Sequence, residues 1–210
     1  MSRKIQETEV RRRYILAAAR RLLESKGIEN TNMEDIASAA EYTRRTLYSY
    51  FRNRDEIYML VYLEDMTTRW QQQQADVAAA VTGLAKVMAF GRSFYAFAKE
   101  HPQSLRLQSF WDYRGIDRGR IGDDIFESFR SKNEELANGL RDALYLGMHD
   151  GSLRPGLAVD PCVSHFVVTL RAAINRALFP TYSFAQFDPD EYVDNYLDLF
   201  ARGIRGHQGE

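Results

Sequence analysis

The sequence of 210 residues predicts an all-helical (all-α) protein. Apolar residues recur at helical spacing in almost every segment, and residues typical of helix caps precede these segments. No segment alternates like a strand. Hydrophobic residues make up 45% of the chain and charged residues 27%, which is typical of a globular protein with a sizeable core. We therefore expect helices joined by short connections.

The first part of the chain is expected to form three short helices and one long helix. The periodic segments cover residues 10–26, 33–40, 44–51 and from 54 through Trp70. Gly27 marks the end of the first helix. The caps of the next three are Thr31 or Asn32, Thr43 and Asn53. Glu56 stands three residues after the last of these caps and completes a capping box.

The rest of the chain continues in the same style. Further helices are expected at residues 83–101, 102–115, 121–150, 161–180 and 188–204. Gly115 and Gly151 mark helix ends, and Pro189 with the acids that follow it suits a helix start.

Charge is unevenly distributed along the chain. Residues 1–54 carry 12 Lys and Arg against 7 Asp and Glu, a net charge of +5. The remaining residues carry 16 against 22, a net charge of −6. A basic segment ahead of an acidic one indicates that the first part meets a polyanion, although chance asymmetry explains the difference equally well.

Residues 43–58, TRRTLYSYFRNRDEIY, interleave four arginines with three tyrosines. The stretch follows a short helix and a turn and supplies a second short helix, which is the order of a helix-turn-helix. The second helix of that motif enters the major groove of DNA. Arginine suits guanine edges and phosphates, while tyrosine and threonine hydroxyls suit phosphate oxygens. The pattern predicts a surface for double-stranded DNA.

The block NMEDIASAAEYTRRTLYSYFRNRDEIY, residues 32–58, resembles the helix-turn-helix signature of TetR-family transcriptional regulators. The preceding helix and its glycine also agree, so the resemblance covers roughly residues 10–60. The matching positions are Asp35-Ile36-Ala37, Ala40, Thr43, Thr46-Leu47-Tyr48, Tyr50-Phe51 and the acid-rich segment after them.

The resemblance implies a ligand-responsive DNA-binding repressor with two domains. Residues 1–54 would form the N-terminal three-helix helix-turn-helix DNA-binding domain. Residues 55–210 would form a larger helical domain for effector binding and dimerisation. A small-molecule effector would release the repressor from its operator.

The resemblance also assigns DNA contacts residue by residue. Bases are expected to meet Tyr42, Arg44, Arg45 and Thr46. The phosphate backbone is expected to meet Thr43, Tyr48, Tyr50 and Arg54, helped by the helix that begins near Asn32. A packing role remains open for Tyr50. Arg11–Arg13 suits either further phosphate contacts or a solvated face.

The turn departs from the family pattern, which usually has glycine where this chain has Glu41. Glycine permits a left-handed backbone, so glutamate must accept strain there or use a different turn. An alternative function remains open on this point. It is an all-helical small-molecule or protein-interaction module that has lost specific DNA binding.

The last two helices carry more apolar surface than a terminal pair needs. The resemblance implies that they form a four-helix bundle across the two-fold axis of a homodimer. Completion of the protomer's own core is the alternative. The residues expected at the dimer interface are Phe166, Leu170, Ile174, Tyr192, Tyr196 and Phe200.

Residues 84–150 are rich in aromatic side chains, and a few polar residues accompany them. A cavity lined in this way suits a small molecule, and in the TetR family such a cavity accepts the effector. We expect an effector that is largely apolar or aromatic, with core packing as the alternative for each residue. The expected ligand-binding residues are Phe90, Phe94, Phe110, Trp111, Tyr113, Phe126, Phe129, Arg171 and Asn175.

No catalytic or metal-binding motif stands out. The histidines lack HExxH spacing, and the chain has no P-loop or G-x-S-x-G elbow. The single cysteine, Cys162, excludes an intrachain disulfide and suits a reducing compartment. Neither a secretory signal nor a membrane-spanning run is visible. The sequence therefore predicts a cytoplasmic protein that is not an enzyme and needs no cofactor, metal or membrane.

Overall fold

The computed structural model describes residues 3–180 and 187–206, which form ten helices and no strand. The all-helical prediction is confirmed. In chain order the helices are α1 (Arg3–Lys26), α2 (Met33–Ala39), α3 (Arg44–Tyr50), α4 (Arg54–Ala79), α5 (Gly83–Glu100), α6 (Pro102–Arg114), α7 (Arg118–Ile121), α8 (Asp123–His149), α9 (Val159–Leu178) and α10 (Pro189–Ile204).

The chain packs into two compact units. The first comprises Met1–Met66 and Gln103–Ser131, and the second comprises Thr67–Pro102 and Lys132–Glu210. Helices α4 and α8 each contribute residues to both units. This division by packing differs from the boundary after residue 54, which is a division by function and stays a prediction.

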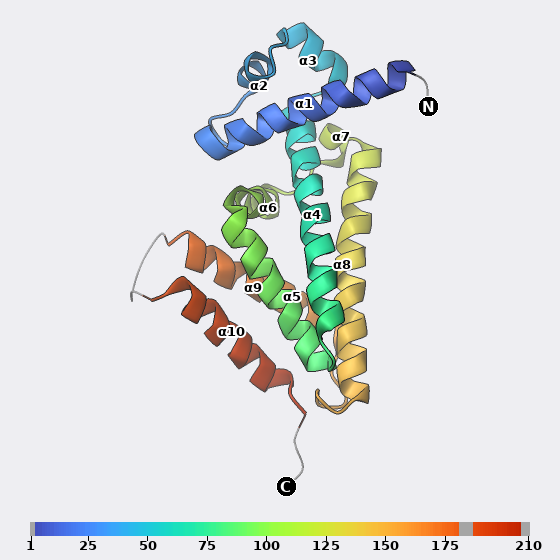
Figure 1. The fold of residues 1–210 in the computed structure, drawn as a ribbon, viewed down its shortest axis with the longest axis vertical. Helices are drawn as coiled ribbons and strands as arrows, with labels where there is room; N and C mark the ends of the chain where they lie inside the picture. The colour runs from blue at the N-terminus through green and yellow to red at the C-terminus, as the bar shows by residue number, and fades with distance from the viewer. Residues whose placement is uncertain (1–2, 181–186, 207–210) are drawn as a thin grey trace. The chain divides into compact units, whose positions relative to one another are not determined.

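The core of the first unit forms where α1, α2, α3 and the start of α4 meet. Helices α2 and α3 lie along one side of α1 (Figure 1). The periodic apolar positions of all four segments point inward, and their packing holds the helices together. The side chains at most 1% exposed include Ile15, Ala18, Ala19, Leu23, Ile36, Leu47, Phe51 and Ile57.

The start of α4 has the predicted cap. The backbone amide of Glu56 donates to Asn53 Oδ1 at 3.0 Å. The Glu56 carboxylate in turn accepts the amide of Arg52 at 2.6 Å, one residue before the cap. The first bond satisfies an amide that the first helical turn leaves unpaired, whereas the second reaches one residue beyond the cap amide that the predicted capping box would use.

The expected continuous helix over residues 121–150 is wrong at its start. Helix α7 ends at Ile121, and α8 begins at Asp123. Gly122 between them has φ 89°, a conformation that favours glycine. A Cβ atom on Gly122 would also lie 2.9 Å from Arg52 Nη1. The positive φ of Gly122 separates the end of α7 from the start of α8.

Two close contacts organise the second unit. A Cβ atom on Gly83 would lie 2.1 Å from the backbone nitrogen of Gly147, so α5 and α8 meet backbone to backbone there. Helices α9 and α10 lie side by side (Figure 1). The rings of Phe166 and Phe200 join this pair at 4.8 Å between centroids.

Tyr58 fastens α4 to the connection between α1 and α2 within the first unit. Its side chain is fully buried. Its hydroxyl donates to the carbonyl of Thr31 at 2.8 Å and lies 3.1 Å from the carbonyl of Ile28. Burial raises the pKa of Tyr58 from 10.0 to about 12.

We expect Tyr58→Phe to lower the free energy of unfolding at neutral pH by about 1 kcal/mol, because a buried hydrogen bond is lost. The raised pKa means that the folded state favours the neutral phenol. This contribution is complete below the unfolded pKa near 10 and is lost as the pH rises through the folded pKa near 12. The difference between wild type and variant should therefore shrink above pH 10. Urea denaturation at a series of pH values measures it, and a constant difference would contradict the assignment.

Candidate nucleic-acid interface

The turn between α2 and α3 is left-handed at Glu41, whose φ is 57°. The amide of Tyr42 donates to the carbonyl of Ala37 at 2.9 Å, and the amide of Glu41 donates to that of Ser38 at 3.1 Å. Of the two options that the sequence left open, glutamate accepts the strained conformation, at a cost of about 1–2 kcal/mol. The turn thus forms without glycine. The alternative function, a helical module that has lost specific DNA binding, therefore gains no support from a different turn at Glu41.

The caps of α2 and α3 lie where the sequence predicts them. Asn32 Oδ1 accepts the amides of Glu34 and Asp35 at 2.8 and 3.0 Å, and Asp35 accepts the amide of Asn32 at 3.2 Å. The ammonium of Lys26 and the Asn32 amide hold the pKa of Asp35 below its usual value. Thr43 Oγ1 accepts the amide of Thr46 at 3.1 Å. These caps fix where each short helix begins.

Arg12 on α1 holds the end of α3. Its guanidinium donates to the carbonyl of Tyr50 at 2.7 Å and lies 4.5 Å above the ring of Phe51. Arg11 donates to the Tyr50 hydroxyl at 3.3 Å. Sequence reasoning missed this positioning role, because the run at Arg11–Arg13 looks the same whether its side chains bind carbonyls, phosphates or water.

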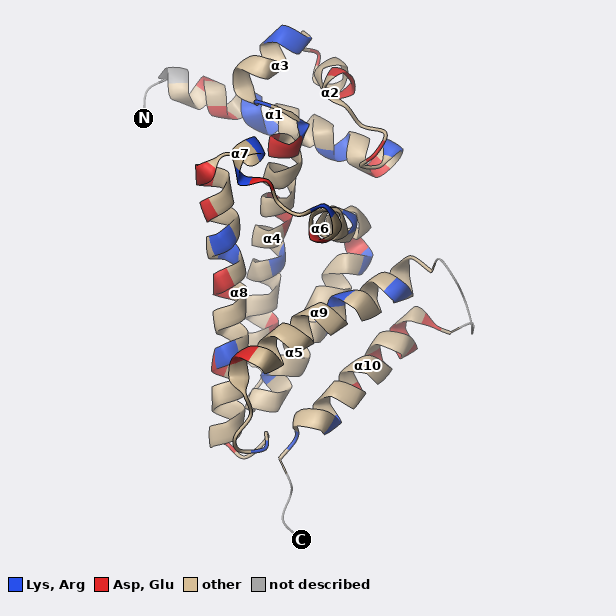
Figure 2. Ribbon diagram, turned by 180° about the vertical axis from the view of Figure 1, so that it is seen from behind, with Lys and Arg blue, Asp and Glu red and all other residues tan. Residues whose placement is uncertain are grey.

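The outward face of α3 carries cations and hydroxyls. Arg44, Arg45 and Tyr48 are exposed, and the guanidinium of Arg44 lies 5.7 Å from the centre of the Tyr48 ring. Figure 2 shows the basic residues at the start of α3. The half-buried Thr46 places its hydroxyl 2.9 Å from that of Thr43. Charged, aromatic and hydroxyl groups therefore share one short helical surface.

The remaining predicted DNA residues lie beside this surface with structural contacts of their own. Tyr42 and Tyr50 are half-buried, and their ring centroids are 6.5 Å apart. Arg54 donates to the carbonyl of Thr31 at 3.0 Å, and its guanidinium lies 5.4 Å from the centre of the Tyr58 ring. The open packing role of Tyr50 thus has support in its contacts with α1.

The six residues expected at a dimer interface divide into two groups. Those at most 2% exposed in the protomer are Phe166, Leu170 and Ile174. Those half-buried are Tyr192, Tyr196 and Phe200. The first group completes the protomer's core, the alternative that the sequence left open. The same two helices expose Val168 by 53% and Leu199 by 69%, and these are apolar side chains that a second copy could cover.

The nine residues expected to bind a ligand are spread over both units. In the second unit, Phe90 stacks on Trp70 at 5.9 Å, and Phe94 lies 4.4 Å from the guanidinium of Arg69. Arg171 and Asn175 are half-buried on α9.

Five of the nine fall in the first unit, where burial separates them. Trp111 is 4% exposed and packs edge-on against Phe110 at 4.9 Å, whereas Tyr113 is 97% exposed. Phe126 and Phe129 on α8 are half-buried. Only some of these side chains therefore lie where an enclosed ligand would meet them.

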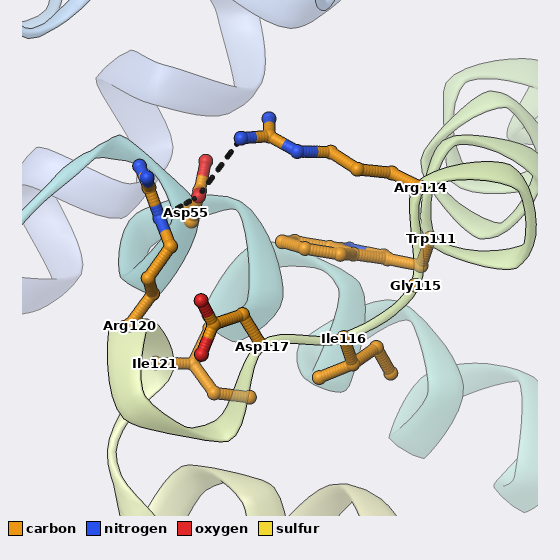
Figure 3. A pocket seen from close by; sticks show the side chains of 8 residues that line it. All are labelled: Asp55, Trp111, Arg114, Gly115, Ile116, Asp117, Arg120 and Ile121. Carbon is orange, nitrogen blue, oxygen red and sulfur yellow. Dashed lines mark ion pairs between the residues drawn. The ribbon is translucent and has the colours of Figure 1, made fainter.

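A cavity of about 360 Å³ opens in the first unit beside the first turn of α4 (Figure 3). Trp111 lines it, together with charged residues that sequence reasoning missed. Asp55 is 2% exposed, and its carboxylate pairs with Arg120 Nε at 2.6 Å and more loosely with Arg114 Nη2 at 3.6 Å. The alternating acidic and basic residues over 112–124 could have indicated a charged site. Their contact with Asp55 could not be predicted, because Asp55 lies far from them in the sequence.

Two negative findings apply to residues 3–180 and 187–206. None of their helices combines the length and apolar composition needed to span a membrane. Nor do their His, Cys, Asp and Glu side chains form a group of three or more that could hold a metal ion.

A capped two-helix motif that presents cations and hydroxyls, ahead of a larger helical body, defines a helix-turn-helix transcriptional regulator. Residues 15–59 match the family described as bacterial regulatory proteins, tetR family. This match confirms the resemblance seen in residues 32–58.

Relatives of this chain include regulators of known identity. The chain is 27% identical over 202 residues to the HTH-type transcriptional repressor KstR2 of Mycolicibacterium smegmatis, covering 95% of this chain and 93% of that protein. The solved structure of the ketosteroid transcriptional regulator KstR2 of Mycobacterium tuberculosis has a TM-score of 0.69 at 18% identity, covering 94% and 96% of the two chains. FadR from Bacillus subtilis, solved with stearoyl-CoA, has a TM-score of 0.70 at 17% identity, covering 91% and 98%. The two structural likenesses establish the fold.

We expect Glu41→Gly to raise the free energy of unfolding by about 0.5–1 kcal/mol, because glycine removes the left-handed strain at some cost in chain entropy. Chemical denaturation measures the change. Glu41→Ala is the matched control, since it removes the charge and keeps the strain. Equal stabilisation by both variants would attribute the effect to charge and contradict the strain argument.

Proposed function

We propose that this protein is a homodimeric repressor that binds double-stranded operator DNA through α3 and leaves it when a small-molecule effector binds the helical body. The observation that carries the proposal is the outward face of α3, with exposed Arg44, Arg45 and Tyr48 on a capped and anchored helix. The match of residues 15–59 to the tetR family supports it. Its place of action would be the cytoplasm, where chromosomal DNA lies.

The proposed DNA contacts follow from this face. Tyr42, Arg44, Arg45 and Thr46 would meet base edges, with arginine best suited to guanine. The phosphate contacts would come from Thr43, Tyr48, Tyr50 and Arg54 and from the start of α2 at Asn32. The bonds that Arg54 and Tyr50 already make position the motif, and their remaining polar atoms can still meet phosphate.

The proposed effector is largely apolar or aromatic. Support comes from the aromatic side chains of the second unit, including Phe90 on Trp70 and Phe94 beside the buried Arg69. It also comes from two relatives, one described as a ketosteroid regulator and one solved with stearoyl-CoA. Ketosteroids and fatty acyl-CoA thioesters are therefore the first compounds to test.

The proposed release mechanism requires two arrangements of the dimer that differ in affinity for the effector. Helix α4 contributes to both compact units, so it provides a continuous covalent path between effector-binding and DNA-binding residues. A ligand that binds both arrangements equally would not change operator affinity.

We expect the double substitution of Arg44→Ala with Tyr48→Ala to weaken binding to a selected operator by at least about tenfold, because a base contact and a phosphate contact are lost. Operators are obtained by selection from random duplexes, and affinity is measured by fluorescence anisotropy. Arg130→Ala, which removes an exposed cation from α8, is the control for charge alone. Unchanged operator affinity in the double variant would contradict the proposed DNA contacts. Operator affinity that stays the same with every effector class would contradict the proposed release.

We expect Leu199→Glu to shift the protein from dimer to monomer, because it places a charge on the most exposed apolar side chain of α10. Sedimentation equilibrium measures the dissociation constant, which should rise at least about tenfold. Val81→Glu is the matched control, since Val81 is 85% exposed and lies outside α9 and α10. Equal effects of the two substitutions would place the interface elsewhere.

A further inference from the structure

Two residues that line the Figure 3 cavity each carry a buried polar atom without a hydrogen-bond partner among the described residues. One is the acceptor Asp55 Oδ1, and the other is the donor Trp111 Nε1. Their side chains are only 2% and 4% exposed. A buried polar atom without a partner costs about 1–3 kcal/mol, so such atoms are uncommon. An unpaired acceptor and an unpaired donor on residues that line the same cavity favour an occupant that offers both complements.

The charges around the cavity balance in sign. Arg114 and Arg120 stand against Asp55 and Asp117, and Figure 3 shows the Asp55 carboxylate between the two arginines. A simple anion would meet two carboxylates there, and a simple cation would meet two guanidinium groups. A molecule carrying both charges avoids each conflict.

Of the two arginines, Arg114 is the one able to bind a ligand. Arg120 is closely paired with Asp55 at 2.6 Å, whereas Arg114 lies 3.6 Å from the same carboxylate, beyond a normal hydrogen bond. The Arg114 side chain is also 40% exposed. Its planar guanidinium can therefore turn to hold a carboxylate with two parallel hydrogen bonds.

The rest of the lining is apolar. Ile116, Ile121 and the indole of Trp111 supply it. A volume of about 360 Å³ falls in the lower part of the range found for small-molecule sites. An occupant with a branched aliphatic or single aromatic group fits both the size and the apolar surface.

We propose that this cavity binds a free α-amino acid with an apolar side chain. The ammonium group would donate to Asp55 Oδ1, and the carboxylate would accept from Arg114 and Trp111 Nε1. The apolar side chain would lie against Ile116 and Ile121. This site shares only Trp111 with the predicted effector residues, so it is a second ligand site, and its existence does not depend on the proposed DNA function.

Isothermal titration calorimetry on the full chain tests the proposal with L-leucine, L-phenylalanine and L-tryptophan as probes. We expect at least one to bind. Two truncated analogues test the charged groups, since 3-phenylpropionate lacks the ammonium and 2-phenylethylamine lacks the carboxylate. Each should bind at least about tenfold more weakly than L-phenylalanine, because each leaves a buried polar partner unpaired. Absence of binding by all three amino acids up to about 10 mM, or equal binding of a truncated analogue, would overturn the proposal.

Arg114→Gln and Trp111→Phe locate the site, and each should weaken amino-acid binding at least about fivefold with circular dichroism unchanged. Arg118→Gln is the matched control. Arg118 lies between lining residues Asp117 and Arg120 in the sequence, but it pairs with Asp123 and does not line the cavity. Unchanged binding in both cavity variants would overturn the site. Operator affinity measured in parallel keeps the two proposals separate, since loss of amino-acid binding alone leaves the DNA function standing.

Discussion

The outward face of α3 depends on how its inward face is held. A helix of seven residues is too short to be stable alone, so its orientation must come from tertiary contacts. Leu47 and Phe51 supply the apolar contact, and Arg12 adds a bond to the Tyr50 carbonyl. Because these side chains point inward, helical geometry places Arg44, Arg45 and Tyr48 on the exposed side of α3. Any DNA-binding role of this surface follows from that anchoring.

Local signals made much of the fold predictable. The caps at Asn32, Thr43 and Asn53 act within three residues of themselves, so the sequence alone shows them. The break at Gly122 was missed because the segment around it keeps a helical pattern. The guanidinium of Arg52, 70 positions earlier in the chain, lies close to Gly122, and no local pattern shows that contact. Short-range chemistry was predictable, and the long-range contact was not.

The site was predictable to the same extent and for the same reason. The order of residues from Asn32 to Phe51 identifies the motif without knowledge of packing. Apolar periodicity on α9 marks a buried face but does not tell whether the protomer or a partner buries it, and Ile174 proves to face the protomer's core. Asp55 resembled an ordinary first-turn acid, because its partner Arg120 lies far along the sequence.

The first turn of α4 connects the proposed amino-acid site with the helix-turn-helix. The side-chain Nδ2 of Asn53 donates to the Arg120 carbonyl at 2.8 Å, and Arg54 donates to the carbonyl of Thr31, the residue before the α2 cap. Asp55 completes the turn with its ion pair to Arg120. A ligand that binds Arg114 and Asp55 Oδ1 would therefore contact a helical turn that is hydrogen-bonded to the residue before α2. Its effect on operator affinity would equal its preference for one arrangement of that turn, and typical couplings of this kind are about 1–3 kcal/mol.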